Sequence, residues 1–116
     1  MKVPWILENP KTSRVWLTVE VEALLAAGAL FAEAHYCQYD QPWRKVTYFL
    51  CWHLPELPAS VKQCHSFSGI CSATHKKHIN LQGTDSNGVF WTLRAQPYPK
   101  QLCKVIAQVI ARQLLL

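Results

Sequence analysis

The chain has 116 residues, of which 50% are hydrophobic and 16% are charged. This length and composition predict a single globular domain over residues 1–116 and exclude a disordered or low-complexity protein. The formal net charge of +5 is unevenly distributed. Residues 1–40 carry three basic and five acidic side chains, whereas residues 41–116 carry nine basic and two acidic ones. We therefore expect the C-terminal portion to present a basic surface to acidic proteins or to phosphates.

No segment has the pattern of a signal peptide or a membrane span. The apolar run at residues 23–32 has ten residues and lies between Glu22 and Glu33, whereas a bilayer span needs about 20 residues. The five cysteines are odd in number and irregularly spaced, which favours reduced thiols. The sequence therefore predicts a cytoplasmic protein without membrane contact.

The first third of the chain predicts an arm, a strand and a helix. Residues 1–13 contain two prolines and are expected to form an extended N-terminal arm. Residues 15–22 alternate apolar and polar side chains, as a half-buried strand does. Alanine-rich residues 22–36 favour a helix, although residues 29–38 also alternate and would form a second strand after a turn at Gly28.

The middle of the chain predicts a buried strand and its antiparallel return. Residues 46–54 are apolar or aromatic at nearly every position, which is typical of a central strand buried on both faces. Pro55 and Pro58 end this strand. Residues 61–65 are expected to return antiparallel to it.

The C-terminal part predicts a hairpin and an amphipathic helix. Residues 78–82 and 89–94 alternate around Asn87-Gly88, a dipeptide that tolerates the positive φ angles of hairpin turns. From Pro99 onward apolar side chains recur at steps of three and four residues, which indicates one buried helix face. This stripe consists of Leu102, Cys103, Ile106, Val109, Ile110 and Leu114. Left uncovered, it would promote self-association.

Together these elements predict the α+β class. The expected domain has two layers, with a mostly antiparallel sheet of four to five strands and two helices, the second at the C-terminus.

Cysteines and histidines gather between residues 64 and 78. Thiolate and imidazole are the ligands that zinc prefers, so Cys64, Cys71, His75 and His78 are candidate metal ligands. The spacing argues against a site, because structural zinc sites usually pair ligands two to four residues apart on a tight turn, and the separation of Cys64 and Cys71 is too long for that. We therefore expect neither a metal nor another cofactor.

A cysteine nucleophile would need a neighbouring base. Cys51 and His53 share one face of the predicted central strand, so a small Cys/His enzyme is one alternative. A thiol in so apolar a strand is usually inert packing, and we predict no enzymatic activity.

Basic and aromatic side chains alternate at several places, a combination that nucleic-acid binders use to contact phosphates and bases. The candidate binding residues are Trp43, Arg44, Lys45, Lys76, Lys77 and Arg94. We expect a small non-enzymatic binding protein whose basic C-terminal portion meets an acidic protein partner. Binding to nucleic acid is the alternative.

Overall fold

The structure is a computed structural model that describes residues 3–66 and 68–115. None of the helices in these ranges combines the length and the hydrophobicity that a membrane span requires. In the labels that follow, β marks a strand, α an α-helix and η a short 3-10 helix. In chain order the elements are β1 (Trp5–Pro10), η1 (Arg14–Leu17), α1 (Val19–Ala26), β2 (Leu30–His35), η2 (Tyr36–Tyr39), β3 (Val46–Trp52), α2 (Leu57–Ser60), α3 (Trp91–Arg94) and α4 (Lys100–Leu114).

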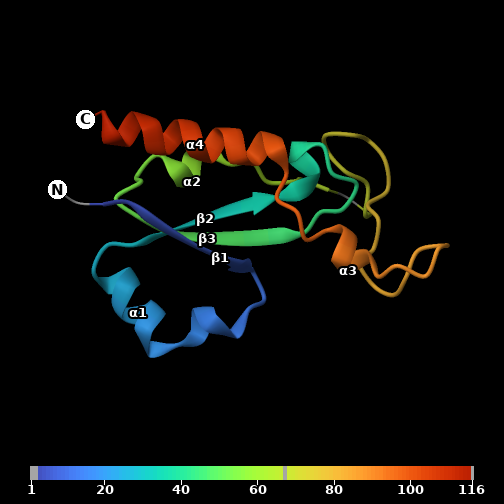
Figure 1. Ribbon diagram of the computed structural model, residues 1–116, viewed down its shortest axis with the longest axis horizontal. Coiled ribbons are helices and arrows are strands. Elements are labelled where there is room, and N and C mark those ends of the chain that lie inside the picture. The colour runs from blue at the N-terminus through green and yellow to red at the C-terminus, as the bar shows by residue number, and fades with distance from the viewer. Residues whose placement is uncertain (1–2, 67, 116) are drawn as a thin grey trace.

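The three strands form an open antiparallel sheet in the order β1-β3-β2. Cys51 of the central strand β3 pairs with Ile6 of β1 on one side and with Leu30 of β2 on the other. Helices α2 and α4 lie on one face of the sheet, and α1 lies on the opposite face (Figure 1). The sheet is therefore covered by helices on both faces.

The alternation of side chains along β3 supplies both cores. Phe49 and Cys51 point toward α4 and belong to the larger cluster, which includes the buried Leu102 and Val109 of that helix. Leu50, between them in sequence, points toward α1 and packs with Val21. This arrangement explains why nearly every residue of β3 is apolar, since both of its faces are buried.

The predicted sheet of four to five strands with two helices is wrong. In the ranges that the structure covers, the sheet has three strands, and four α-helices are present. Two of these helices are longer than one turn: α1 has eight residues and α4 has fifteen. The predicted two layers become three, because α1 covers the sheet face opposite α2 and α4 (Figure 1).

The strand predicted at residues 15–22 is helical instead. The hydroxyl of Thr18 accepts a hydrogen bond from the backbone N–H of Val21 and caps α1 at its N-terminus. Glu20 and Glu22 lie in the first turn, where the helix dipole favours negative charge. Capping and charge therefore outweigh the alternation of apolar and polar residues.

The helix predicted at residues 22–36 ends early, and the alternative of a strand after Gly28 is the one observed. Gly28 has a φ of +112°, which a residue with a side chain rarely adopts, and β2 begins two residues later. Ala32 and Ala34 are completely buried in β2 on the face that α2 and α4 cover. Tertiary packing overrides the helix preference of alanine at these positions.

Three further predicted strands, residues 61–65, 78–82 and 89–94, are absent from the described residues. Residues 61–65 run beside β2 without forming a ladder: the carbonyl of Lys62 accepts from the backbone N–H of His35. The turn at Asn87-Gly88 does form and is held by the Asp85 side chain, but one isolated bridge, Thr84 with Phe90, is its only pairing. The chain then enters α3 where the second hairpin strand was predicted.

The central strand and the C-terminal helix are confirmed. Strand β3 covers residues 46–52 of the predicted 46–54, and α4 covers Lys100–Leu114 directly after Pro99. The segment predicted as an extended arm contains β1, which pairs with β3 along its whole length.

Candidate metal centre

Three buried cysteines and one histidine converge where β2 ends. Cys37 lies in η2 directly after β2, Cys64 follows α2, and Cys71 and His78 lie in the irregular loop that comes next. Their three sulfur atoms and one imidazole nitrogen all lie within 4.8 Å of one another. The Sγ of Cys64 and the Nε2 of His78 are 3.6 Å apart. This is the distance range of zinc ligands, since two sulfurs each about 2.3 Å from a tetrahedral ion lie about 3.8 Å apart.

The loop that carries Cys71 and His78 is folded back on itself by backbone hydrogen bonds. The N–H of Cys71 donates to the carbonyl of Lys76 at 2.8 Å, and the N–H of His78 donates to the carbonyl of Gly69 at 2.9 Å. Gly69 and His75 have positive φ angles that permit these tight reversals. Two ligands seven residues apart are thereby brought side by side.

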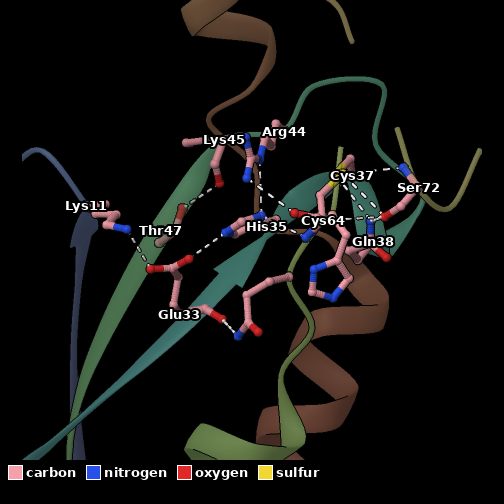
Figure 2. Close-up of polar contacts among 12 residues, drawn as sticks. Lys11, Glu33, His35, Cys37, Gln38, Arg44, Lys45, Thr47, Cys64 and Ser72 are labelled. Atoms are coloured by element: carbon pink, nitrogen blue, oxygen red, sulfur yellow. Dashed lines mark hydrogen bonds and ion pairs between the residues drawn. The ribbon is translucent and has the colours of Figure 1, made fainter. Parts of the chain in front are cut away.

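The sulfur atoms receive hydrogen bonds from nearby polar groups. The backbone N–H and the hydroxyl of Ser72 lie 3.4 and 3.5 Å from the Sγ of Cys64, and the N–H of Ala73 lies 3.4 Å from the Sγ of Cys71. The side-chain amide of Gln38 donates toward Cys37 (Figure 2). The same amide also donates toward Cys71. Donors aimed at sulfur favour the thiolate form, which is the form that binds metals.

These contacts shift the pKa values of Cys64 and Cys37 in opposite directions. Burial acts to raise the pKa of Cys64, but the hydrogen bonds from Ser72 and the neighbouring thiols outweigh it and lower that pKa to about 6. Burial, together with the adjacent Cys64 and Cys71, raises the pKa of Cys37 to about 12. The pKa of Cys71 is lowered as well, so Cys64 and Cys71 ionise before Cys37.

A buried polar network supports Cys64 from the sheet side (Figure 2). His35, the last residue of β2, is 2% exposed. Its Nδ1 accepts hydrogen bonds from the backbone N–H of Cys64 at 2.8 Å and from Nε of Arg44 at 3.2 Å. Its Nε2 lies 2.7 Å from Glu33, which also pairs with Lys11 at 2.9 Å.

The ring of His35 is neutral in this arrangement. A nitrogen that accepts two hydrogen bonds carries no proton, so the proton is on Nε2 and is donated to Glu33. Burial lowers the pKa of His35 and the nearby Arg44 guanidinium acts in the same direction, against the opposing effect of Glu33. The contact with Glu33 is therefore a hydrogen bond from a neutral ring rather than an ion pair.

Three of the four metal ligands considered from the sequence belong to this cluster, and the fourth does not. His75 is exposed and is not a member. Cys37 takes its place, although it lies 27 residues before Cys64 and no local spacing pattern connects the two. Nothing in the sequence connects Cys37 with the other three ligands.

The candidate binding residues are distributed between the interior and the surface. Trp43 is buried, and Arg44 donates to His35 and to the carbonyl of Cys64. Lys45 is half-buried, with its Nζ 5.0 Å from the centre of the Tyr36 ring. The three other candidates are exposed: Lys76, Lys77 and Arg94, the last of which pairs with Asp85.

The Cys51 and His53 pair lacks the contacts of a nucleophile and its base. The thiol of Cys51 is directed at the carbonyls of Leu30 and Leu54, at 3.3 and 3.8 Å. His53 packs its ring against Trp52, and no hydrogen bond joins it to Cys51 among residues 3–66 and 68–115. Burial raises the pKa of Cys51, which disfavours the reactive thiolate.

Comparison with known proteins gives no match: no protein-family model, curated sequence or solved structure is significantly similar to this chain. The candidate site therefore rests on its own geometry.

Proposed function

We propose that this chain is a small non-enzymatic binding protein stabilised by one zinc ion, with Cys37, Cys64, Cys71 and His78 as its ligands. The observation that carries the proposal is the convergence of their four ligand atoms within 4.8 Å. Three thiolates and one imidazole form a common ligand set for structural zinc, and four protein ligands leave no open position for a reacting molecule. The role assigned to the ion is therefore structural.

The composition of the metal-binding segment supports a structural role. Within residues 65–66 and 68–90, Cys71 is the one buried side chain. A segment with so little apolar burial cannot offset the entropy lost on ordering its backbone. An ion that joins this segment to Cys37 and Cys64 supplies the missing stabilisation, since zinc binding by small domains contributes directly to folding free energy.

Elemental analysis of the purified protein, combined with two histidine variants, tests the proposal. We expect one zinc per chain, retained in His75→Asn and lost or strongly weakened in His78→Asn. The two histidines lie three residues apart in one loop, so His75→Asn is a matched control for the substitution itself. Absence of zinc from a folded protein would support the sequence-based expectation that no metal is bound, and equal zinc binding by both variants would remove His78 from the site.

A cysteine pair gives an independent test. Cys37→Ser should abolish stoichiometric zinc, whereas Cys103→Ser on the exposed surface of α4 should leave it unchanged. Cys37 is the decisive residue because it is the ligand most distant in sequence. Full zinc content in Cys37→Ser would remove it from the site.

The structural role predicts where the protein opens when zinc is removed. With a strong chelator present, limited proteolysis should cut first within residues 65–90, while the sheet and α4 stay protected. Cleavage that starts elsewhere, or an unchanged pattern, would contradict a structural ion.

A second proposal concerns the partner, and it rests on Lys76 and Lys77. Both side chains are exposed on the loop between Cys71 and His78. We expect them to bind an acidic protein, and nucleic acid is the alternative partner. The salt dependence of DNA binding distinguishes the two partners.

A further inference from the structure

The backbone of Cys64 is held from both sides by the side chains of His35, the last residue of β2, and Arg44, two residues before β3. Nδ1 of His35 accepts its N–H at 2.8 Å, and Nη2 of Arg44 donates to its carbonyl oxygen at 3.3 Å. Nε of Arg44 also donates to the same Nδ1 at 3.2 Å. His35 and Arg44 therefore act as one unit around a single residue, as Figure 2 shows.

The orientation of the His35 ring is fixed by a chain of contacts across the sheet. Its Nε2 donates to Oε2 of Glu33 at 2.7 Å, and Oε1 of Glu33 lies 2.9 Å from Nζ of Lys11, just beyond the end of β1. The backbone carbonyl of Glu33 accepts a 2.6 Å hydrogen bond from the amide of Gln63, the residue before Cys64. The carboxylate thus sets the tautomer that leaves Nδ1 free to accept.

We infer that His35 is a positioning residue for the metal centre: by accepting the N–H of Cys64 it sets the direction of the Cys64 sulfur and so the affinity for zinc. This inference rests on the proposed function. Groups outside the ligand shell that orient the ligands typically change metal affinity 10- to 100-fold when they are removed. A buried imidazole that touches the backbone of one proposed ligand, two residues before another, is placed for this role.

Asparagine and glutamine separate the two functions of the ring. Asparagine places an acceptor oxygen at the same distance along the side chain as Nδ1, so His35→Asn keeps an acceptor for Cys64. Glutamine reaches the position of Nε2 and can donate to Glu33, but it has no acceptor where Nδ1 was. Both variants lose the ring, so a role in packing alone would affect them similarly.

Zinc affinity is measured by competition with a chromophoric chelator, and the ligand geometry is followed by the absorption of the cobalt(II)-substituted protein. We expect His35→Gln to bind zinc about 10- to 100-fold more weakly than wild type and to show shifted cobalt bands. His35→Asn should stay close to wild type in both. Equal affinity for wild type and His35→Gln, or equal weakening in both variants, would overturn the positioning role.

A measurement on the wild-type chain covers the case in which a variant does not fold. Long-range proton–nitrogen correlation of the histidine rings identifies which nitrogen of His35 carries the proton. We expect Nε2–H, and a proton on Nδ1 would overturn the inference because that nitrogen could then not accept from Cys64. The proposed function fails differently: in that case the wild-type protein itself binds no zinc.

Discussion

The Nζ atom of Lys45 donates a 2.7 Å hydrogen bond to the carbonyl oxygen of Ala95, fifty residues further along the chain. Ala95 is buried and follows α3, so this bond fastens the segment before α4 to the start of β3. Burial lowers the pKa of Lys45, as expected for an ammonium group partly withdrawn from water. The lysine contributes to the fold rather than to a free basic surface.

Replacement of Lys45 should therefore destabilise the protein. Lys45→Met leaves the carbonyl of Ala95 without its partner, and loss of a hydrogen bond from a charged donor costs about 1.5 to 3 kcal/mol. The free energy of unfolding from urea titration measures this cost. Lys77→Met, at an exposed position, is the control and should change stability little. Equal stability of the two variants would contradict the structural role of Lys45.

The exposed lysines allow a test of partner class without unfolding the protein. Replacing Lys76 and Lys77 with glutamine should leave the unfolding midpoint unchanged. If the pair contacts phosphates, duplex DNA binding should fall with salt, with a log-log slope of about −1.8 for two contacts, and the double variant should flatten it. We expect only feeble binding to generic DNA or RNA at 150 mM salt. Micromolar binding that the double variant abolishes would favour the nucleic-acid alternative over an acidic protein.

The apolar stripe of α4 has a buried part and a half-exposed part. Leu102 is 1% exposed, whereas Ile106 is half-buried and lines an open apolar groove between α4 and β1. We expect Leu102→Ala to cost about 2 to 5 kcal/mol and Ile106→Ala clearly less, because the side chain of Leu102 is almost fully buried and that of Ile106 is only half-buried. Chemical denaturation of both variants checks the order. A larger cost for Ile106→Ala, dependent on protein concentration, would indicate self-association through this groove.

Alkylation rates test the Cys/His enzyme alternative. The thiolate is the reactive form, so a raised pKa leaves Cys51 protonated at pH 8 and slow to react. Iodoacetamide should modify the exposed Cys103 much faster than Cys51, as mass spectrometry of the peptides would show. The modification rate at Cys51 should keep rising at pH values at which an ordinary thiol is already fully ionised. Fast modification of Cys51 at neutral pH would revive the catalytic reading.

The sequence predicts those parts of the fold that local pattern determines. Strand β3 is predicted by an unbroken run of apolar residues, as expected for a strand buried on both faces. Helix α4 is predicted by apolar residues that recur every three or four positions. The sequence predicts a helix where β2 lies, because its alanines have no β preference of their own. Their small size suits the close approach of the covering helices, and that requirement exists only in the folded chain.

The candidate site was predictable only in part, because local sequence patterns identify some of its ligands and tertiary contacts bring in the other. Cys64, Cys71 and His78 lie within one short stretch, and the sequence identifies them as candidate metal ligands. Their spacing, however, argues against a zinc site. The missing ligand, Cys37, comes from a separate element and meets the others only because β2 and the segment after α2 run side by side. Side chains that converge through tertiary contacts leave no spacing rule in a single sequence.

The sheet order β1-β3-β2 also implies an order of assembly. Residues 36–45 connect β2 to β3. Residues 11–45, which include α1 and β2, separate the end of β1 from the start of β3. Closing the shorter loop loses less chain entropy, so the β2–β3 pair should form in the folding transition state and β1 should dock afterwards. Ile6→Val in β1 should then accelerate unfolding, while Ala34→Gly in β2 should slow folding.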